Sequence, residues 1–159
     1  YYLFSVKRFS SVLNVSRETF TASGRGKGME SEKKPSILLV DDEKEVTDIL
    51  FKRLSRRGYP CRTAGNGQEA LDSMKESPSE IVVLDVKMPV MDGLTALGHI
   101  LRNWPDTQVI LLSGHADMQL AVQAIEEGAF GYLMKPVDFE DLLFKIEDAA
   151  TQRQLESHK

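Results

Sequence analysis

Four short apolar runs in this chain each end at a polar residue, and this feature constrains the fold more than any other. Runs 37–40, 81–84 and 109–112 lead into Asp41-Asp42, Asp85 and Ser113, and segment 129–134 leads into Lys135. Short continuous apolar runs are typical of strands that are covered on both faces. The carboxyl ends of parallel strands meet at one edge of a sheet, where ligands bind. The sequence therefore predicts three carboxylates, a hydroxyl and an ammonium group at that edge.

Helical patterns alternate with these runs along the whole chain from Pro35. Apolar residues with helical spacing occur in segments 46–54, 70–74, 94–104, 118–125 and 139–149. Segment 59–64 is interpreted as an edge strand, because Pro60 cannot donate to a sheet ladder. Strict alternation predicts a doubly wound (βα)5 α/β fold with a parallel five-stranded sheet. The flavodoxin-like strand order 2-1-3-4-5 places the proline strand outside and the most apolar strands inside.

Several residues indicate where these helices begin and end. Asn66 and Glu69 have the spacing of a capping box, and Asp117 and Asp138 precede later helices as cap candidates. Gly58 and Gly128 are expected to close two helices.

Composition is that of an ordinary globular protein, with 42% hydrophobic and 28% charged residues. No apolar run is long enough to span a bilayer, so no membrane association is expected. The single cysteine, Cys61, excludes an internal disulfide and suits a reducing cytoplasm, which is the expected location. The net charge of −4 divides into +4 for residues 1–28 and −8 for the remainder. Direct nucleic-acid binding by that acidic remainder is not expected.

Residues 1–34 differ from the rest and are interpreted as a flexible N-terminal extension. The segment 24–28 is rich in glycine and reads as a linker. We favour Met29 as the native start, with the upstream residues as translated leader sequence. A transit peptide and a membrane-surface helix are the alternatives for this segment.

The clustered carboxylates suggest a specific chemistry. Like charges this close need compensation, and Mg²⁺ is a hard cation that a few carboxylates can hold. A carboxylate can also attack phosphorus and form an aspartyl phosphate. Lys135 and the Ser113 hydroxyl could then help to neutralise the phosphoryl oxygens.

Residues 36 to about 150 resemble the receiver domain of two-component response regulators. The matching segments, in order, are 39–43 (LVDDE), 84–93 (LDVKMPVMDG), 112–116 (LSGHA) and 131–136 (GYLMKP). By position, the resemblance implies that Asp85 is the phosphoacceptor and that Asp42 binds Mg²⁺ directly. Asp41 would complete the acidic pocket, and the backbone carbonyl of Lys87 would be a further metal ligand.

The resemblance also implies a switch. Lys135 would bind the phosphoryl group and be joined to Pro136 by a cis peptide bond. Ser113 would be the switch hydroxyl, and Tyr132 the aromatic residue that changes rotamer. Lys87 and His115 lie where this family tunes the lifetime of the phosphoryl group.

The expected function is a phosphorylation-activated signalling switch that is not an enzyme towards other substrates. A sensor histidine kinase or phosphotransfer protein would supply the phosphoryl group. The face formed by the fourth helix, fifth strand and fifth helix would then control a partner or form a homodimer. The chain is divided into the extension 1–34, the receiver domain 35–150 and a C-terminal helix end and tail, 151–159.

Other functions remain open from the sequence alone. Parts of the receiver resemble those attached to σ54-dependent transcription activators, so the chain could be a fragment whose output domain is missing. A Mg²⁺-dependent aspartyl-phosphate phosphatase fits less well, because that class has a second Asp where Lys87 stands. A phosphorylation-independent adaptor and a flavin-binding protein are disfavoured by the intact acidic set and by the lack of a phosphate-cradling loop.

Overall fold

The computed structural model describes residues 33–157, and within them five strands form one parallel sheet. The strands are β1 (Ile37–Val40), β2 (Cys61–Ala64), β3 (Ile81–Asp85), β4 (Gln108–Ser113) and β5 (Gly131–Met134). Their order is β2-β1-β3-β4-β5, which confirms the predicted flavodoxin-like fold. The strand that follows Pro60 lies at an edge, as expected from the missing amide donor.

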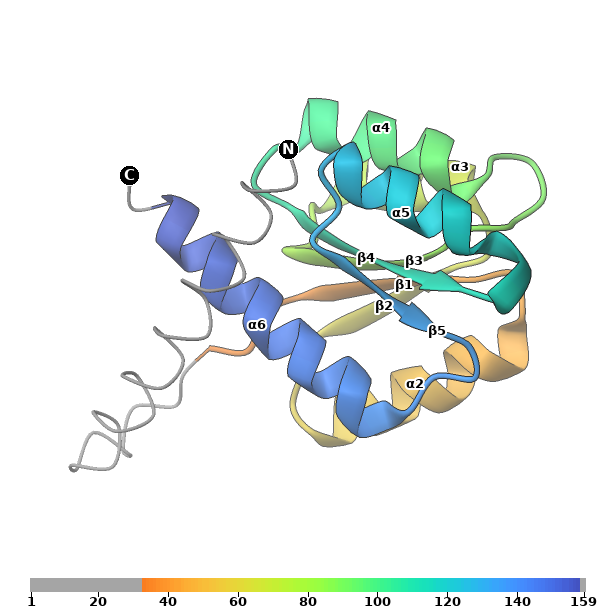
Figure 1. Ribbon diagram of the computed structural model, residues 1–159. Coiled ribbons are helices and arrows are strands. Elements are labelled where there is room, and N and C mark those ends of the chain that lie inside the picture. The colour runs from red at the N-terminus through yellow and green to blue at the C-terminus, as the bar shows by residue number, and fades with distance from the viewer. Residues whose placement is uncertain (1–32, 158–159) are drawn as a thin grey trace.

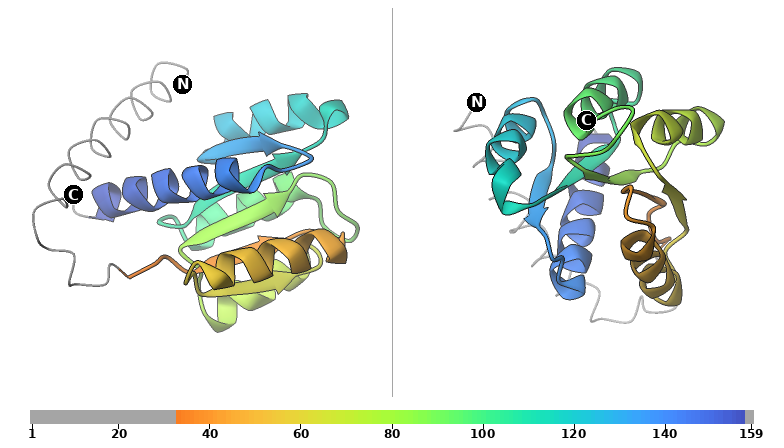
Figure 2. Two further views of the ribbon diagram at one scale, coloured as in Figure 1. Left: turned by 90° about the horizontal axis from the view of Figure 1, so that it is seen from below. Right: turned by 90° about the vertical axis from the view of Figure 1, so that its right-hand side faces the viewer.

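Helices cover both faces of the sheet (Figures 1 and 2). They are α2 (Lys44–Arg56), α3 (Gly67–Glu76), α4 (Gly93–Asn103), α5 (Met118–Glu126) and α6 (Phe139–Ser157), with a short 3₁₀ helix, η1 (His115–Asp117), before α5. One face carries α3, α4 and α5, and the other carries α2 and α6. None of the helices in residues 33–157 is both long and apolar enough to cross a bilayer.

The core is divided by the sheet into two apolar layers. Alternate strand residues face opposite sides, so Leu38 and Val82 pack under α3 and α4, whereas Leu39 and Val83 pack under α2 and α6. All four side chains are 1% exposed or less. Burial of this continuous apolar surface is the main favourable term for a domain of this size. The core therefore fixes the strand ends that carry the polar residues.

The helix ends follow the predicted signals with one exception. Asn66 Oδ1 accepts a hydrogen bond from the Glu69 amide at 2.9 Å, and Asp138 Oδ1 accepts one from the Asp141 amide at 3.0 Å. Gly58 and Gly128 adopt φ values of +88° and +116°, which glycine tolerates without a steric penalty. Asp117 stands at the N-cap of α5, but its side chain accepts no hydrogen bond from the first turn of that helix.

Other boundaries differ from the sequence pattern. The edge strand begins at Cys61 rather than Tyr59, and β5 begins at Gly131 rather than Ala129. Helix α6 continues without a break to Ser157, so most of segment 151–159 is helical. Ile49 shares the apolar spacing of α2 but is 59% exposed. The predicted extension, except for Lys33 and Lys34, lies outside the described residues, as does the proposed start at Met29.

Candidate functional site

Three aspartates meet at the carboxyl edge of the sheet. Strands β1 and β3 are neighbours, with Val40 paired to Leu84, so the residues that follow them lie at the same level. Carboxylate oxygens of Asp41, Asp42 and Asp85 all lie within 4.8 Å of one another. Asp41 and Asp85 are buried, whereas Asp42 is exposed. The predicted convergence of these carboxylates is therefore present, with one of them open to solvent.

Lys135 enters this cluster from the end of β5, next to a cis peptide bond with Pro136. Its Nζ lies 2.9 Å from Asp41 Oδ2 and 3.1 Å from Asp85 Oδ2. A third contact, at 3.3 Å, joins Nζ to Glu43 Oε1. The sequence interpretation gave Glu43 no role, although it directly follows the paired aspartates. One ammonium group therefore faces several carboxylates.

The electrostatics of the cluster reflect this imbalance. Burial, together with the negative charge of Asp41, raises the pKa of Asp85 to about 6. Lys135 lowers this value only in part. Burial by itself would lower the pKa of Lys135, but its contacts with Asp41 and Asp85 raise the pKa above the ordinary value. In this arrangement the carboxyl edge of the sheet holds excess negative charge.

Backbone groups hold the carboxylates in place. The Glu43 amide donates to Asp41 Oδ1 at 2.9 Å, and the Lys87 amide donates to Asp85 Oδ1 at 3.4 Å. Gly93, at the start of α4, lies so close to the end of β3 that a Cβ there would overlap the Asp85 carbonyl and approach Val86 Cα to 2.8 Å. The absence of a side chain at Gly93 therefore lets α4 start directly against the strand that carries Asp85.

The donor set fits a hard divalent cation. Carboxylate oxygens and backbone carbonyls are the ligands that Mg²⁺ prefers, and it commonly uses few protein ligands and keeps bound water. The raised pKa of Asp85 indicates that its charge is not fully compensated by Lys135. The exposed Asp42 leaves one side of the cluster accessible. These features match the predicted Mg²⁺ site in chemistry and in access.

Ser113 and Tyr132 lie on the two strands next to the cluster. Ser113 ends β4 and is fully buried, and its hydroxyl donates to the Gly114 carbonyl at 3.0 Å. Tyr132 is partly buried and packs against the apolar layer under α3, α4 and α5. Leu111 is its partner across the β4–β5 pair. The two predicted switch residues are thus placed on adjoining strands.

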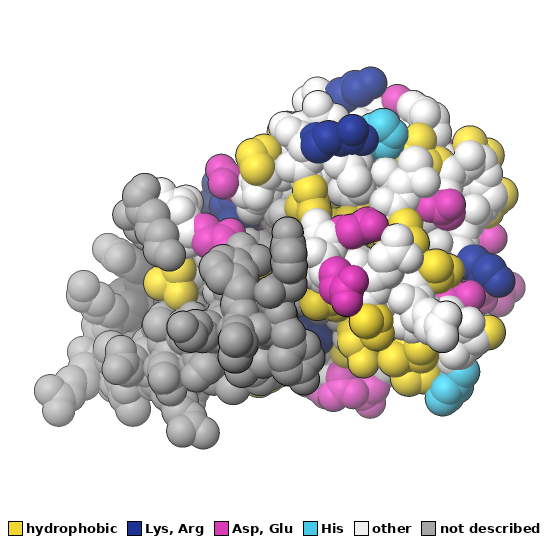
Figure 3. Space-filling view, turned by 45° about the horizontal axis from the view of Figure 1, so that its top comes forward, with side chains coloured by type: hydrophobic (Ala, Val, Ile, Leu, Met, Phe, Trp, Pro, Cys, Tyr) yellow, Lys and Arg dark blue, Asp and Glu magenta, His cyan; other side chains and the backbone are white. Residues whose placement is uncertain are grey.

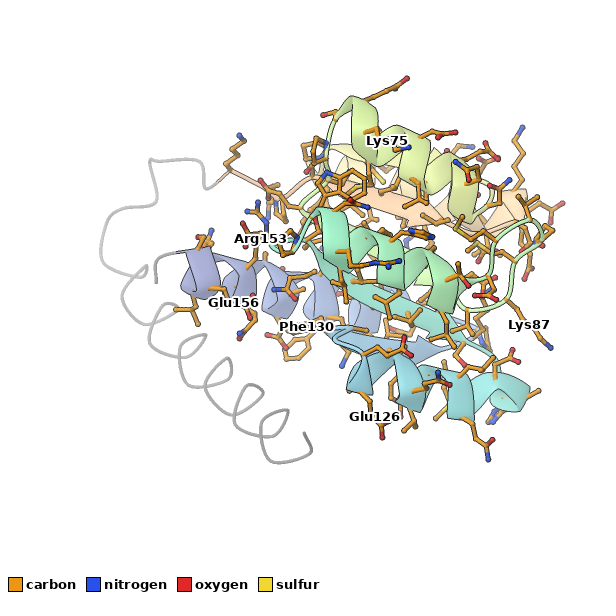
Figure 4. The ribbon with its side chains drawn as sticks, turned by 90° about the horizontal axis from the view of Figure 1, so that it is seen from above. Lys75, Lys87, Glu126, Phe130, Arg153 and Glu156 are labelled. Carbon is orange, nitrogen blue, oxygen red and sulfur yellow. The ribbon has the colours of Figure 1, made fainter. Side chains whose placement is uncertain are left out.

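Lys87 and His115 lie in the two loops beside Asp85. Lys87 projects from the loop after β3 (Figure 4) and is 72% exposed, and its Nζ lies 3.5 Å from Asp117 Oδ1. His115 begins η1 and is exposed. The sequence interpretation took Asp117 only as a helix cap and missed this ion pair, because the two residues are thirty positions apart.

The surface formed by α4 and α5 is not dominated by one kind of side chain in Figure 3. Hydrophobic side chains lie among Asp and Glu side chains on the face covered by α4 and α5 (Figure 3). Val122 on α5 is 50% exposed, and Glu126 and Glu127 at the end of the helix are also exposed.

Comparison with known proteins gives a consistent result. The model of the response regulator receiver domain matches residues 37–147. The DNA-binding transcriptional regulator NtrC of Escherichia coli K12 is 34% identical over 118 residues, which cover 74% of this chain and 25% of that protein. The regulatory protein AtoC of the same organism is 36% identical, over 77% of this chain and 26% of its own length. The chain thus spans about a quarter of the length of these relatives.

Solved structures agree with this assignment. The receiver domain of NtrX from Brucella abortus has a TM-score of 0.69 and 34% identity, covering 72% of this chain and 97% of that domain. A response regulator receiver domain protein from Clostridium thermocellum has a TM-score of 0.73 and 35% identity, covering 76% and 98%. With its strand order, its aspartate cluster and these matches, the chain belongs to the response regulator receiver domain family.

Proposed function

We propose that this chain is a phosphorylation-activated switch whose phosphoacceptor is Asp85. The observation that supports this most directly is the placement of Lys135 Nζ within 3.1 Å of Asp85 Oδ2 and 2.9 Å of Asp41 Oδ2. A cation in this position can neutralise a phosphoryl oxygen without moving far. Phosphoryl transfer depends mainly on such positioning and charge neutralisation.

The proposed donor is the phosphohistidine of a sensor histidine kinase or of a phosphotransfer protein. An oxygen of Asp85 attacks phosphorus as the P–N bond breaks, and the bonding electrons return to the imidazole, which takes up a proton. The product is an acyl phosphate, whose P–O bond is later cleaved by water. Asp42, Asp85, the Lys87 carbonyl and Asp41 would hold Mg²⁺. The metal would supply further neutralisation of the phosphoryl oxygens.

The proposed switch uses Ser113 and Tyr132. A phosphoryl group adds nearly two negative charges and three acceptor oxygens. The Ser113 hydroxyl would leave the Gly114 carbonyl and donate to a phosphoryl oxygen, and Tyr132 would move into the vacated space. The equilibrium between the two conformations of the face made by α5, β5 and α6 would then shift towards the phosphorylated one. That face is the proposed surface for a downstream partner or for a phosphorylation-dependent homodimer.

Incubation with Mg²⁺ and acetyl phosphate tests this proposal. We expect the intact mass to rise by one phosphoryl group, and we expect no rise for Asp85→Asn or without Mg²⁺. Asp106→Asn is the matched control, because Asp106 is an exposed aspartate just before β4, at the amino edge of the sheet and so away from the aspartate cluster. Equal labelling of Asp85→Asn and the unaltered chain would overturn the assignment of the acceptor.

A second candidate concerns the output. The names of the relatives describe transcriptional regulators, and the chain covers only about a quarter of them. We propose that the switch acts on transcription through a further domain of the natural protein or through a partner. The intact mass of the natural gene product distinguishes these two routes. Turnover of a phosphate ester would instead support the phosphatase alternative, which Lys87 disfavours.

A further inference from the structure

An ion pair between Lys87 and Asp117 lies in the loops beside Asp85, and Asp117 is also the N-cap residue of α5. Lys87 Nζ lies 3.5 Å from Asp117 Oδ1, which joins the loop after β3 to η1 after β4. The side chain of Asp117 is 16% exposed, so it is largely enclosed, while that of Lys87 is 72% exposed. The contact therefore links the segment that carries the acceptor to the segment that begins α5.

Asp117 differs from the Asn and Asp residues that precede three other described helices, whereas Glu43, the N-cap of α2, also makes no side-chain cap. The side chains of Asn66, Asp92 and Asp138 accept hydrogen bonds from the amides of Glu69, Thr95 and Asp141 at 2.9, 2.8 and 3.0 Å. Asp117 has φ −113° and ψ 15°, outside the extended region that N-caps normally adopt, and its carboxylate is turned to Lys87 instead. Helix α5 thus begins without a side-chain cap.

We propose that Asp117 is a positioning residue that holds the Lys87 ammonium group until Asp85 is phosphorylated. This inference rests on the proposed phosphorylation of Asp85. The phosphoryl group then attracts Lys87, and the released Asp117 moves its backbone into the extended region, so that its carboxylate caps the first turn of α5. Phosphorylation of Asp85 thereby changes the start of α5, which is part of the surface proposed for a downstream partner.

The energies of the two contacts make this exchange feasible. Only the lysine of the Lys87–Asp117 pair is exposed, but water around its ammonium group screens the attraction, so the pair is weak enough to be broken. A phosphoryl group carries nearly twice the charge of a carboxylate, and the backbone amide of Lys87 already donates to Asp85 Oδ1. The freed aspartate gains a cap, which is favourable at a helix N-terminus both as a hydrogen-bond acceptor and as a negative charge. The attraction of Lys87 to the phosphoryl group and the capping of α5 by Asp117 both favour the phosphorylated state.

The first test measures the binding of beryllofluoride, an analogue of the phosphoryl group, to the full chain with Mg²⁺. We expect Asp117→Asn to bind it about two- to fivefold more tightly, because no ion pair has to be broken and asparagine can still cap α5. Asp138→Asn removes the same charge from another N-cap and should leave the affinity unchanged. In a Lys87→Met background, Asp117→Asn should have no further effect. An equal effect in both backgrounds would overturn the proposal.

A second test does not require phosphorylation. In the unmodified chain, Lys87→Met should free Asp117 to cap α5, so hydrogen exchange at the Leu120 amide should slow about two- to fivefold. The amide of Asp141, at the start of α6, is the internal reference. Unchanged exchange at Leu120 would refute the proposal even if Asp85 is phosphorylated. Slowed exchange in a chain that acetyl phosphate does not label would instead remove the proposed function and leave only the ion pair.

Discussion

Polar side chains at the carboxyl edge and at the amino edge of the sheet are paired in different ways. At the carboxyl edge, Asp41 and Asp85 are buried side by side and share a single lysine. At the amino edge, Arg62 donates to the Ser73 carbonyl at 3.2 Å and to Ser79 Oγ at 3.0 Å, and it also contacts the Ser77 carbonyl. Thr107 Oγ1 donates to the Ser79 carbonyl at 3.0 Å. The carboxyl edge keeps charge that Lys135 compensates only in part, whereas Arg62 and Thr107 at the amino edge are hydrogen-bonded.

This difference shows how one sheet can be stable and still hold buried charge at one edge. Buried polar groups normally have partners, and a buried charge without sufficient compensation costs free energy. Proteins tolerate such cost at functional sites when other parts of the fold stabilise the structure. We therefore expect substitutions at the carboxyl edge to depend on pH and Mg²⁺, and substitutions at the amino edge to depend on neither.

The largest effect is expected for Lys135→Met without metal at neutral pH. The substitution leaves Asp41 and Asp85 without their shared cation, and we expect it to lower the free energy of unfolding by about 3 kcal/mol. Saturating Mg²⁺ should restore part of this loss. Urea denaturation with and without Mg²⁺ measures it, with Lys75→Met on the exposed face of α3 as control. If Mg²⁺ does not reduce the loss of stability in Lys135→Met, repulsion between the uncompensated carboxylates is not its cause.

Asp85→Asn is expected to act in the opposite direction in metal-free protein. The pKa of Asp85 rises from 3.8 to about 6 in the folded chain, so the folded state binds this proton more tightly than the unfolded state. The resulting stabilisation is present below about pH 4 and is lost as the pH rises through about 6. Above pH 6 the variant should therefore be more stable than the unaltered chain by about 1–3 kcal/mol.

Thermal or urea unfolding between pH 4 and pH 7 checks this prediction. The difference between the two proteins should be near zero at the acidic end and should grow through the intermediate range. Mg²⁺ should reverse the order above pH 6, because it favours the charged carboxylate that the variant lacks. A difference that stays constant with pH would show that packing, and not the ionisation of Asp85, causes it.

The smallest effect is expected for Arg62→Met at the amino edge. Loss of its hydrogen bonds leaves the Ser73 and Ser77 carbonyls at the end of α3 without this donor, and we expect a destabilisation of about 1–2 kcal/mol. Neither pH nor Mg²⁺ should change this value, and the proposed phosphorylation of Asp85 should be unaffected. Arg56→Met, at the exposed end of α2, is the matched control. If the loss of stability in Arg62→Met depended on Mg²⁺, the proposed difference between the two edges would be wrong.

Much of the fold and the site could be predicted because local patterns carry the necessary information. Strand positions follow from short apolar runs, and the edge position of β2 follows from Pro60. Once the strand order is known, Asp41 and Asp85 must lie together, since their strands are neighbours and run in the same direction. The position of Lys135 after β5 follows by the same reasoning.

Contacts between distant side chains required the tertiary structure. Lys135 and Glu43 are 92 positions apart, and nothing in the local sequence specifies that Glu43 turns towards the lysine. Asp117 has the sequence context of a helix cap, yet its carboxylate contacts Lys87 in another loop. The exposure of Ile49 likewise depends on how α2 is rotated against the sheet.

The sequence by itself therefore determined the backbone plan and the edge at which the polar residues meet. Periodicity and turn residues act over a few positions, and they are sufficient to place strands and helices. The tertiary structure decided which charge faces which, because electrostatic energy depends on distances and burial that only packing sets. The uneven charge at the carboxyl edge, and the diversion of Asp117 from its helix to Lys87, belong to this second class.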